Sequence, residues 1–438
     1  MSSLSMRIIA LFMCIQCLFS QLKNKTTEEL KINADEIIAT ADFCGRANDF
    51  IVLSADSPVE VDCAIISEAG SSIKEFKLEA LVDNSYQLVT MGDTVNKLRF
   101  CSFDKIASTS FKLTVLDCKE EGFSLSSIKL CKKAAVNKDS FKVVSYLAAE
   151  NLTEAELNLN LDPEAVRVST DIILIGVVSF DENGIITVKD DTTLRFLISE
   201  IRRISPETVI HINILGPKGE DSERLHRRAM NSNRSTFIKE IKRLLTEYEC
   251  DGIYFDWEYP YQKYSKFTFS SFLISLDREL PDKQIGAALS GWCCSLNPKA
   301  IEALDCITVM AYDLFDDFGY HSSFTTAHTA VEQFLSAGYP ADKLTLGLAF
   351  YSRPIDEGLY WHSYKDYYEQ MGKYKNTATV NIDGKETICY FNSAQLIEDK
   401  TSFAVQSGLG GVMIWHFNCD TPFENPLSLY RAIDSALS

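Results

Sequence analysis

Asp251-Gly252-Ile253-Tyr254-Phe255-Asp256-Trp257-Glu258-Tyr259-Pro260 is the most informative segment of this 438-residue chain. Successive side chains of a β-strand point to opposite faces, so the stretch has one polar and one apolar face. The polar face carries Tyr254, Asp256 and Glu258, and the apolar face carries Ile253, Phe255 and Trp257. Two carboxylates therefore stand side by side near the carboxyl end of a buried strand. In an α/β barrel, catalytic groups occupy that end of the strands.

The sequence on both sides of this stretch alternates between short apolar runs and helical patterns. With the stretch itself, we expect eight strands, the others at residues 141–147, 171–180, 209–215, 285–290, 307–312, 344–351 and 411–415. Helical spacing is clearest at residues 194–201, 237–248, 269–280 and 394–405. Eight strands alternating with helices over about 300 residues predict a single (β/α)8 TIM barrel. A doubly wound sheet is the rival architecture, but the chain has no Gly-x-Gly-x-x-Gly turn to hold a dinucleotide.

The central stretch resembles the Asp-Gly-x-Asp-x-Asp-x-Glu signature of glycoside hydrolase family 18, the chitinases and chitinase-like proteins. Asp251, Gly252, Asp256, Glu258 and the trailing Tyr-Pro match, whereas Tyr254 replaces the middle Asp. Three later segments are also similar to family motifs. They are Met310-Ala311-Tyr312-Asp313, Leu346-Gly347-Leu348-Ala349-Phe350-Tyr351-Ser352-Arg353 and Gly411-Val412-Met413-Ile414-Trp415.

The resemblance implies a retaining, substrate-assisted mechanism, in which the N-acetyl carbonyl of the substrate attacks the anomeric carbon. Glu258 would protonate the leaving oxygen, and Asp256 would hold and charge-stabilise the N-acetyl group. A nearby Asp256 carboxylate would raise the pKa of Glu258 and keep it protonated near neutral pH. Tyr312 completes the catalytic candidates. The substrate-binding candidates are Asp251, Tyr254, Asp313, Trp415, Tyr146 and Arg353.

Two departures from the family pattern bear on activity. Asn213-Ile214-Leu215-Gly216 stands where the family usually has Ser-x-Gly-Gly, which alters one wall of the site. Tyr254 is the more serious change, because a phenol with a reference pKa of about 10 cannot take over the charge of a carboxylate. We expect its hydroxyl to donate a hydrogen bond to Asp256, and we expect hydrolysis to be slowed.

The region before the barrel has a period-two pattern with polar turns, which predicts a small all-β, sandwich-like accessory domain. We place this domain at residues 21–138 and the barrel at residues 139–438. Arg7 and the apolar run of residues 8–19 resemble a secretory signal peptide, which we assign to residues 1–20. The predicted location is extracellular, or the lumen of the secretory or lysosomal pathway. Sequons at Asn24, Asn151 and Asn233 fit that route.

Charge and cysteine content limit the partners. The chain has 43 basic and 61 acidic residues and a net charge of −18, which disfavours nucleic acid but is compatible with a neutral polysaccharide. Two of its 13 cysteines lie in the signal segment, and in an exported protein the others favour disulfides over metal ligands. Outside that segment no Cys-x-x-Cys or Cys/His cluster has zinc spacing. We expect no metal, no cofactor, no membrane contact after signal cleavage, and a monomer.

These patterns together predict a secreted, chitinase-like hydrolase of β-1,4-linked N-acetylglucosamine polymers or oligomers. Its partner would be chitin or an N-acetylglucosamine-containing oligosaccharide. One alternative is a non-hydrolytic chitin- or glycan-binding lectin, which Tyr254 favours and the retained Glu258 disfavours. Another is an endo-β-N-acetylglucosaminidase acting on N-glycans, which the sequence does not separate from a chitinase.

Overall fold

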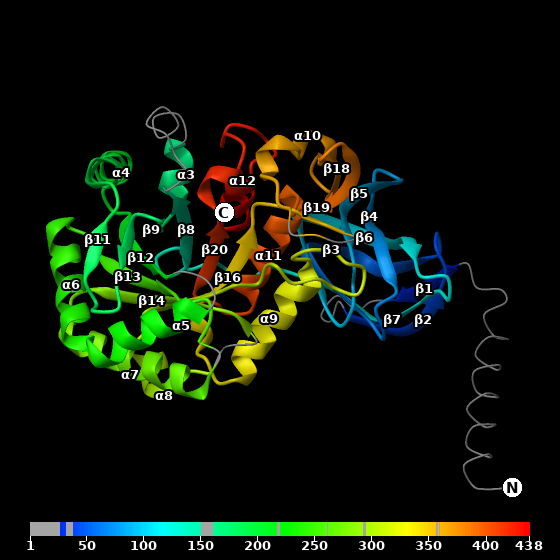
Figure 1. Cartoon of the computed structure of the whole chain (residues 1–438). Coiled ribbons are helices and arrows are strands. Elements are labelled where there is room, and N and C mark those ends of the chain that lie inside the picture. The colour runs from blue at the N-terminus through cyan, green and yellow to red at the C-terminus, as the bar shows by residue number, and fades with distance from the viewer. Residues whose placement is uncertain are drawn as a thin grey trace, which may run out of the picture. The chain divides into compact units, whose positions relative to one another are not determined.

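The computed structural model describes residues 27–31, 38–149, 161–216, 220–260, 262–291, 295–355, 358 and 360–438. The chain divides into two compact units, Met1–Lys133 and Ala134–Ser438 (Figure 1). The division falls a few residues before the boundary expected from the sequence. The proposed signal peptide and the sequons at Asn24 and Asn151 lie outside the described residues.

The first unit is a mainly antiparallel β-sheet. Its strands are β1 (Thr27–Lys31), β2 (Ile38–Gly45), β3 (Phe50–Glu68), β4 (Ile73–Val82), β5 (Ser85–Asp93), β6 (Arg99–Cys118) and β7 (Phe123–Cys131). They follow the order β2-β7-β3-β6-β4-β5, and β1 pairs in parallel with β3. The all-β prediction is confirmed, and two of the strands are long, because β3 and β6 have 19 and 20 residues. A register shift between Ser54 and Val59 interrupts their pairing, so a period-two pattern alone did not reveal their length.

The second unit is the predicted barrel. Eight parallel strands close it in the order β12-β13-β14-β15-β16-β20-β8-β9. They are β8 (Lys142–Ala148), β9 (Asp171–Ile175), β12 (Val209–Leu215), β13 (Gly252–Asp256), β14 (Gln284–Leu289), β15 (Cys306–Val309), β16 (Leu344–Ala349) and β20 (Gly411–Trp415). Each corresponds to a strand expected from the sequence. These strands are almost wholly buried because side chains fill the centre and helices cover the outside.

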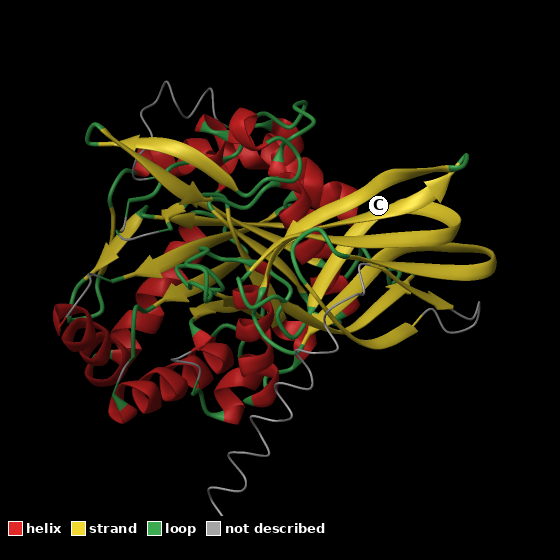
Figure 2. Cartoon of the chain, turned by 90° about the vertical axis from the view of Figure 1, so that its right-hand side faces the viewer, coloured by secondary structure: helices red, strands yellow, loops and turns green. Residues whose placement is uncertain are grey.

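Helices surround the barrel strands (Figure 2). They are α3 (Pro163–Val168), α4 (Asp191–Ile204), α5 (Glu220–Arg227), a π-helix (Arg228–Ser232), α6 (Arg234–Glu247), α7 (Lys263–Glu279), α8 (Pro298–Glu302), α9 (Phe324–Ser336), α10 (Tyr368–Met371), α11 (Ala394–Gln406) and α12 (Leu429–Ala436). α4 shows the local rule: the Asp190 carboxylate caps it by accepting from the Thr193 N–H, and its expected apolar stripe is buried. Short helices such as α3 and α8 carry too few apolar repeats to be recognised from the sequence.

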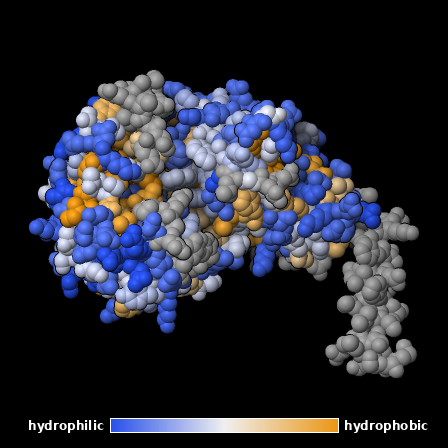
Figure 3. Space-filling view, viewed as in Figure 1, coloured by the Kyte–Doolittle hydropathy of each residue, from blue (hydrophilic) through white to orange (hydrophobic). Residues whose placement is uncertain are grey.

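Two small antiparallel sheets accompany the barrel strands. β10 (Val178–Phe180) pairs with β11 (Ile186–Val188). β17 (Arg353–Pro354), β18 (Thr377–Ile382) and β19 (Lys385–Tyr390) form a three-stranded sheet in the connection between β16 and β20. The surface is mainly hydrophilic over α5 and α7 (Figure 3). Among the described residues, no helix has the length and apolar character needed to cross a membrane.

Candidate active site

A cavity of about 230 Å³ lies at the carboxyl end of the barrel strands. It is lined by Asp256, Glu258, Tyr259, Ser290, Met310, Tyr312, Asp313, Tyr351, Arg353, Trp361 and Trp415. Six of the nine site residues named from the sequence are in this lining. They come from four strands that are far apart in the chain, so closure of the barrel brings them together. This volume is slightly below the roughly 300–1,000 Å³ of typical ligand pockets.

β13 delivers the two carboxylates. Asp256 is its last residue and is 4% exposed, and Glu258 follows just beyond the strand end. Trp257 points the other way, as the alternation predicts, and stacks on His226 with ring centroids 4.6 Å apart. This apolar anchor on the outer side of β13 fixes the backbone from which Asp256 and Glu258 project. The peptide bonds after Glu258 and Trp415 are both cis.

Asp313 is held by several donors. Its Oδ1 accepts from Tyr351 Oη at 2.8 Å and from Arg353 Nε at 2.7 Å, while its Oδ2 accepts from Arg353 Nη2 at 2.8 Å. This is the two-pronged geometry in which arginine binds a carboxylate most strongly. Burial opposes ionisation of Asp313, but the nearby His321 ring and the hydrogen bonds from Arg353 and Tyr351 outweigh it and hold its pKa well below the usual range. Asp313 therefore remains a fixed negative charge at the cavity wall.

His321 supports Asp313 from behind and was not recognised in the sequence. Its Nε2 accepts a hydrogen bond from the Asp313 backbone N–H at 3.0 Å. Asp313 has φ of 55°, a left-handed conformation that Asp tolerates better than most residues. Burial lowers the pKa of His321, which favours the neutral ring that can act as this acceptor. Nothing in its spacing from Asp313 marks it out, because the contact depends on the path of the intervening loop.

Aromatic rings form the floor and one wall. Trp415, the last residue of β20, lines the cavity, and Tyr146 of β8 packs against it with centroids 5.4 Å apart. Tyr146 is 1% exposed and lies outside the cavity lining, so in this arrangement it packs behind Trp415. Tyr312 is half-buried, and burial raises its pKa well above the usual value, which keeps its hydroxyl protonated as a hydrogen-bond donor.

Tyr254 does not make the contact that we expected from the sequence. Among the described residues, its hydroxyl donates no hydrogen bond to Asp256. The ring crosses the barrel interior instead and meets His211 edge-on at 4.9 Å. Burial raises the pKa of Tyr254 well above its usual value, and the nearby Cys306 and Asp171 raise it further. A side chain that stands perpendicular to its strand reaches across the barrel, so it does not fold back toward the residue two places along.

Asp251, which we assigned to substrate binding from the sequence, lies away from the cavity. It precedes β13, at the opposite end of the strand from the cavity. Its Oδ2 accepts from the Ile210 N–H at 2.8 Å and pairs with Arg202 at the end of α4. Asp251 therefore joins two strands and a helix at the amino end of the barrel, and this is a structural role, not a substrate contact.

The altered third-strand segment contributes to the outer packing. A Cβ atom at Gly216 would lie 2.1 Å from Cε1 of His226, so the glycine makes room for the ring that stacks on Trp257. His226 is fully buried, and this burial lowers its pKa to about 4. Asn213, in the same segment, is 1% exposed beside Tyr254 in the strand register.

The chemistry available in the cavity is that of carboxylates, a guanidinium, hydroxyls and aromatic rings. Within the described ranges, no three His, Cys, Asp or Glu side chains gather into a metal site. Two carboxylates at the end of one strand, beside tyrosine hydroxyls and an indole, suit proton transfer to a sugar held against an aromatic face.

Comparisons with known proteins agree on one family. The family model described as Glycosyl hydrolases family 18 matches residues 142–420. Probable chitinase 2 from Drosophila melanogaster is 22% identical over 252 residues, which are 44% of this chain and 52% of that protein. Chitinase 63 from Streptomyces plicatus is 29% identical over 240 residues, 43% of this chain and 38% of that protein. The match thus spans about half of the first relative and less of the second.

Solved structures show the same fold. The GH18 chitinase ChiB from the chitin utilization locus of Flavobacterium johnsoniae is 25% identical, with a TM-score of 0.56 over 68% of this chain and 94% of that chain. A GH18 chitinase from Cycas revoluta in complex with (GlcNAc)3 is 19% identical, with a TM-score of 0.56 over 68% of this chain and 100% of that chain. Because the family model matches more than half of the chain, from the first barrel strand to beyond the last, this protein belongs to the glycosyl hydrolases of family 18.

Proposed function

We propose that this protein hydrolyses β-1,4-linked N-acetylglucosamine polymers or oligomers by a retaining, substrate-assisted mechanism. The observation that carries the proposal is the meeting of Asp256, Glu258 and Tyr312 in one cavity floored by Trp415. The chitinase names of the relatives, and the oligosaccharide in the Cycas revoluta complex, support this choice of substrate.

Each group has a defined part in the proposed reaction. Glu258 protonates the leaving oxygen and later removes a proton from the attacking water. Asp256 holds the N-acetyl group and stabilises the positive charge that develops on it. Tyr312 donates a hydrogen bond to the N-acetyl oxygen, since its raised pKa keeps the hydroxyl protonated. Trp415 offers a ring face to the sugar.

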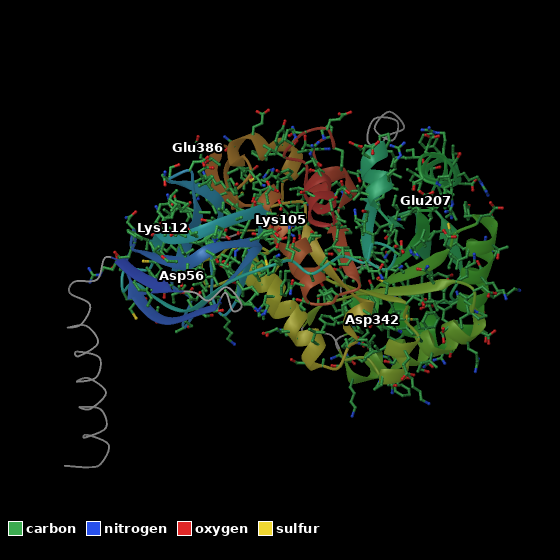
Figure 4. The ribbon with its side chains drawn as sticks, turned by 180° about the vertical axis from the view of Figure 1, so that it is seen from behind. Asp56, Lys105, Lys112, Glu207, Asp342 and Glu386 are labelled. Carbon is green, nitrogen blue, oxygen red and sulfur yellow. The ribbon has the colours of Figure 1, made fainter. Side chains whose placement is uncertain are left out.

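The decisive experiment is turnover of a fluorogenic chitotrioside by wild type and Glu258→Gln. Removing a positioned general acid should lower kcat by roughly 10² to 10⁴-fold, while binding of the oligosaccharide persists. Glu207→Gln is the matched control, because Glu207 is an exposed carboxylate in the turn between α4 and β12, at the amino end of the barrel (Figure 4). An unchanged rate in Glu258→Gln, or an equal loss in Glu207→Gln, would contradict the proposal.

Tyr254 favours a second candidate function, a glycan-binding lectin without turnover. No carboxylate stands below Asp256 on β13, and among the described residues the tyrosine hydroxyl makes no hydrogen bond to Asp256. A lectin would bind chitotriose and release no product over days, and correctly folded Tyr254→Asp would gain turnover. The same assay with an N-glycan in place of the chitotrioside distinguishes an endo-β-N-acetylglucosaminidase from a chitinase.

We also propose that the protein is exported and acts as a monomer, with Arg7 and the apolar run of residues 8–19 as the export signal. Intact-mass analysis of protein from a secreting host should then show a chain that begins near Gln21. A glycan at Asn233 is not expected, because its side-chain amide donates to the Glu182 carbonyl at 2.8 Å and the residue is half-buried. Retention of Met1 in the secreted product would overturn the export proposal.

A further inference from the structure

Two cysteines of the first unit face each other across neighbouring strands. Cys63 in β3 and Cys131, the last residue of β7, are direct partners in the antiparallel register. Side chains of directly opposed residues lie on the same face, with Cβ atoms about 4.5–5.5 Å apart. Their thiols are within hydrogen-bonding reach of each other. In the structure both residues carry thiols.

We propose that Cys63 and Cys131 form a disulfide when the protein matures in an oxidising compartment. Cα atoms of opposed antiparallel residues are about 4.5 or 5.5 Å apart, and disulfides accept roughly 4.4–6.8 Å, so no strand has to move far. The bond joins the end of β7 to the middle of β3 and closes a loop that contains β4, β5 and β6. This inference is independent of the proposed hydrolase activity.

The other cysteines in the described part of this unit have different neighbours, so Cys63 and Cys131 are the two that face each other. Cys101 in β6 is opposite Ala64, the residue after Cys63, and packs in the apolar core on the other face of the sheet. Cys44 donates to the Ser124 hydroxyl at 3.6 Å. The Cys118 thiol meets the backbone N–H of Ala47.

The two thiols differ in acidity, and this difference favours one of them as the first nucleophile. The hydrogen bond from Cys63 lowers the pKa of Cys131, with burial opposing and Lys129 assisting, so Cys131 is the better thiolate nucleophile. The hydrogen bond to Cys131 raises the pKa of Cys63, and burial raises it further, so Cys63 keeps its proton. Cys131 is also the more exposed of the two, which lets a disulfide reagent reach it first.

The reaction balances as two thiol–disulfide exchanges. The Cys131 thiolate attacks a disulfide such as oxidised glutathione or the active-site disulfide of an oxidase, forms a mixed disulfide and expels one thiolate. Cys63 then gives up its proton, attacks the Cys131 sulfur and expels the second thiolate. Both cysteines are oxidised, the donor disulfide is reduced to two thiols, and the two protons end on those thiols.

The test maps cysteines by mass spectrometry in protein from a secreting host, alkylated under denaturing conditions without reductant and then digested. We expect a linked peptide pair containing Cys63 and Cys131 that separates on reduction. Reduced protein placed in a glutathione redox buffer should form the same link, whether or not the chain is exported in its own cell. The Cys101→Ser variant, which alters a neighbouring buried cysteine, should keep the link.

Calorimetry provides a second readout. A disulfide that closes a long loop stabilises mainly by restricting the unfolded chain, so reduction should lower the Tm of the first unit by roughly 10 °C. The Cys63→Ser/Cys131→Ser variant should lose that response to reductant. If the variant fails to fold, the mapping of wild type decides alone. Alkylated thiols at both positions in both preparations, or a link from either residue to another cysteine, would overturn the proposal.

Discussion

At Gly286, a Cβ atom would lie 2.2 Å from Cζ of Tyr254, so β14 has no side chain where the tyrosine ring crosses the barrel. His211 and Tyr146 meet the same ring edge-on, at 4.9 and 6.4 Å. Tyr254 is thus packed as a core residue that fills space beneath the cavity, although its sequence position is that of a family carboxylate. Its hydroxyl lies near the Cys306 thiol, which is a weak hydrogen-bonding group.

The Tyr254→Phe variant tests this reading. Because the hydroxyl makes no hydrogen bond to Asp256, its removal should change kcat by less than about twofold and the free energy of unfolding by less than about 1 kcal/mol. Steady-state turnover of the chitotrioside and urea unfolding measure the two effects. Tyr254→Asp is the contrasting variant, and it should cost about 3–5 kcal/mol through its cavity and unpaired charge. A tenfold fall of kcat in Tyr254→Phe would show that the hydroxyl acts on Asp256 after all.

At the scale of an element, the connection between β16 and β20 adds an aromatic wall to the cavity. Trp361 is 48% exposed, lines the cavity and lies edge-on to Tyr351 and His416, with centroids 6.0 and 5.9 Å away. The His416 ring is held in turn by Cys419, whose sulfur is 3.3 Å from Nε2. A half-exposed indole in a fixed orientation is suited to stack on a sugar outside the reacting position.

Trp361→Ala should therefore weaken substrate binding and leave the chemical step intact. We expect KM for the chitotrioside to rise roughly three- to tenfold, the scale of one aromatic contact, with kcat changed by less than about twofold. Tyr360→Ala is a matched control, since Tyr360 is 52% exposed and adjacent in sequence but lies outside the cavity lining. Equal effects of the two substitutions, or a fall in kcat alone, would exclude a binding role for Trp361.

At the scale of the whole molecule, buried titratable groups make the stability of the barrel depend on pH. Burial lowers the pKa of His226 and His416 to about 4, and it also lowers the pKa of His321. Such histidines take up protons mainly in the unfolded state once the pH falls below about 6.5, so acid destabilises the fold. Burial raises the pKa of Asp420 to about 6, which works in the opposite direction because the folded state then binds the proton.

The three histidines take up protons on unfolding and Asp420 releases one, so unfolding near pH 5 takes up a net of roughly one to two protons. The free energy of unfolding of the barrel should therefore fall by about 3 kcal/mol between pH 6.5 and pH 4.5. Tryptophan fluorescence in urea follows this unit specifically, because all four tryptophans of the chain lie after residue 134. A stability that is flat or rising as the pH falls through this range would show that the histidines remain accessible to protons in the folded state.

The barrel could be predicted from local sequence patterns. Short apolar runs located all eight strands, because a barrel strand buries both of its faces, and helical spacing located the main helices, because each long helix buries one face. The sequence also indicated that Asp256 and Glu258 share a face, since alternation along a strand is a local property. The segments that carry Tyr312, Asp313 and Trp415 were recognised by their similarity to the motifs of the family.

Which of these residues meet, and in which direction they point, depends on how the chain packs in three dimensions. Closure of the barrel brings the ends of β13, β15, β16 and β20 to one cavity and leaves Asp251 at the far end of its strand. The direction of the Tyr254 ring depends on Gly286 in the next strand, and the partner of Cys63 depends on the register of β7. These are contacts between segments far apart in the chain, fixed by packing and strand register, and local sequence patterns carry no record of them.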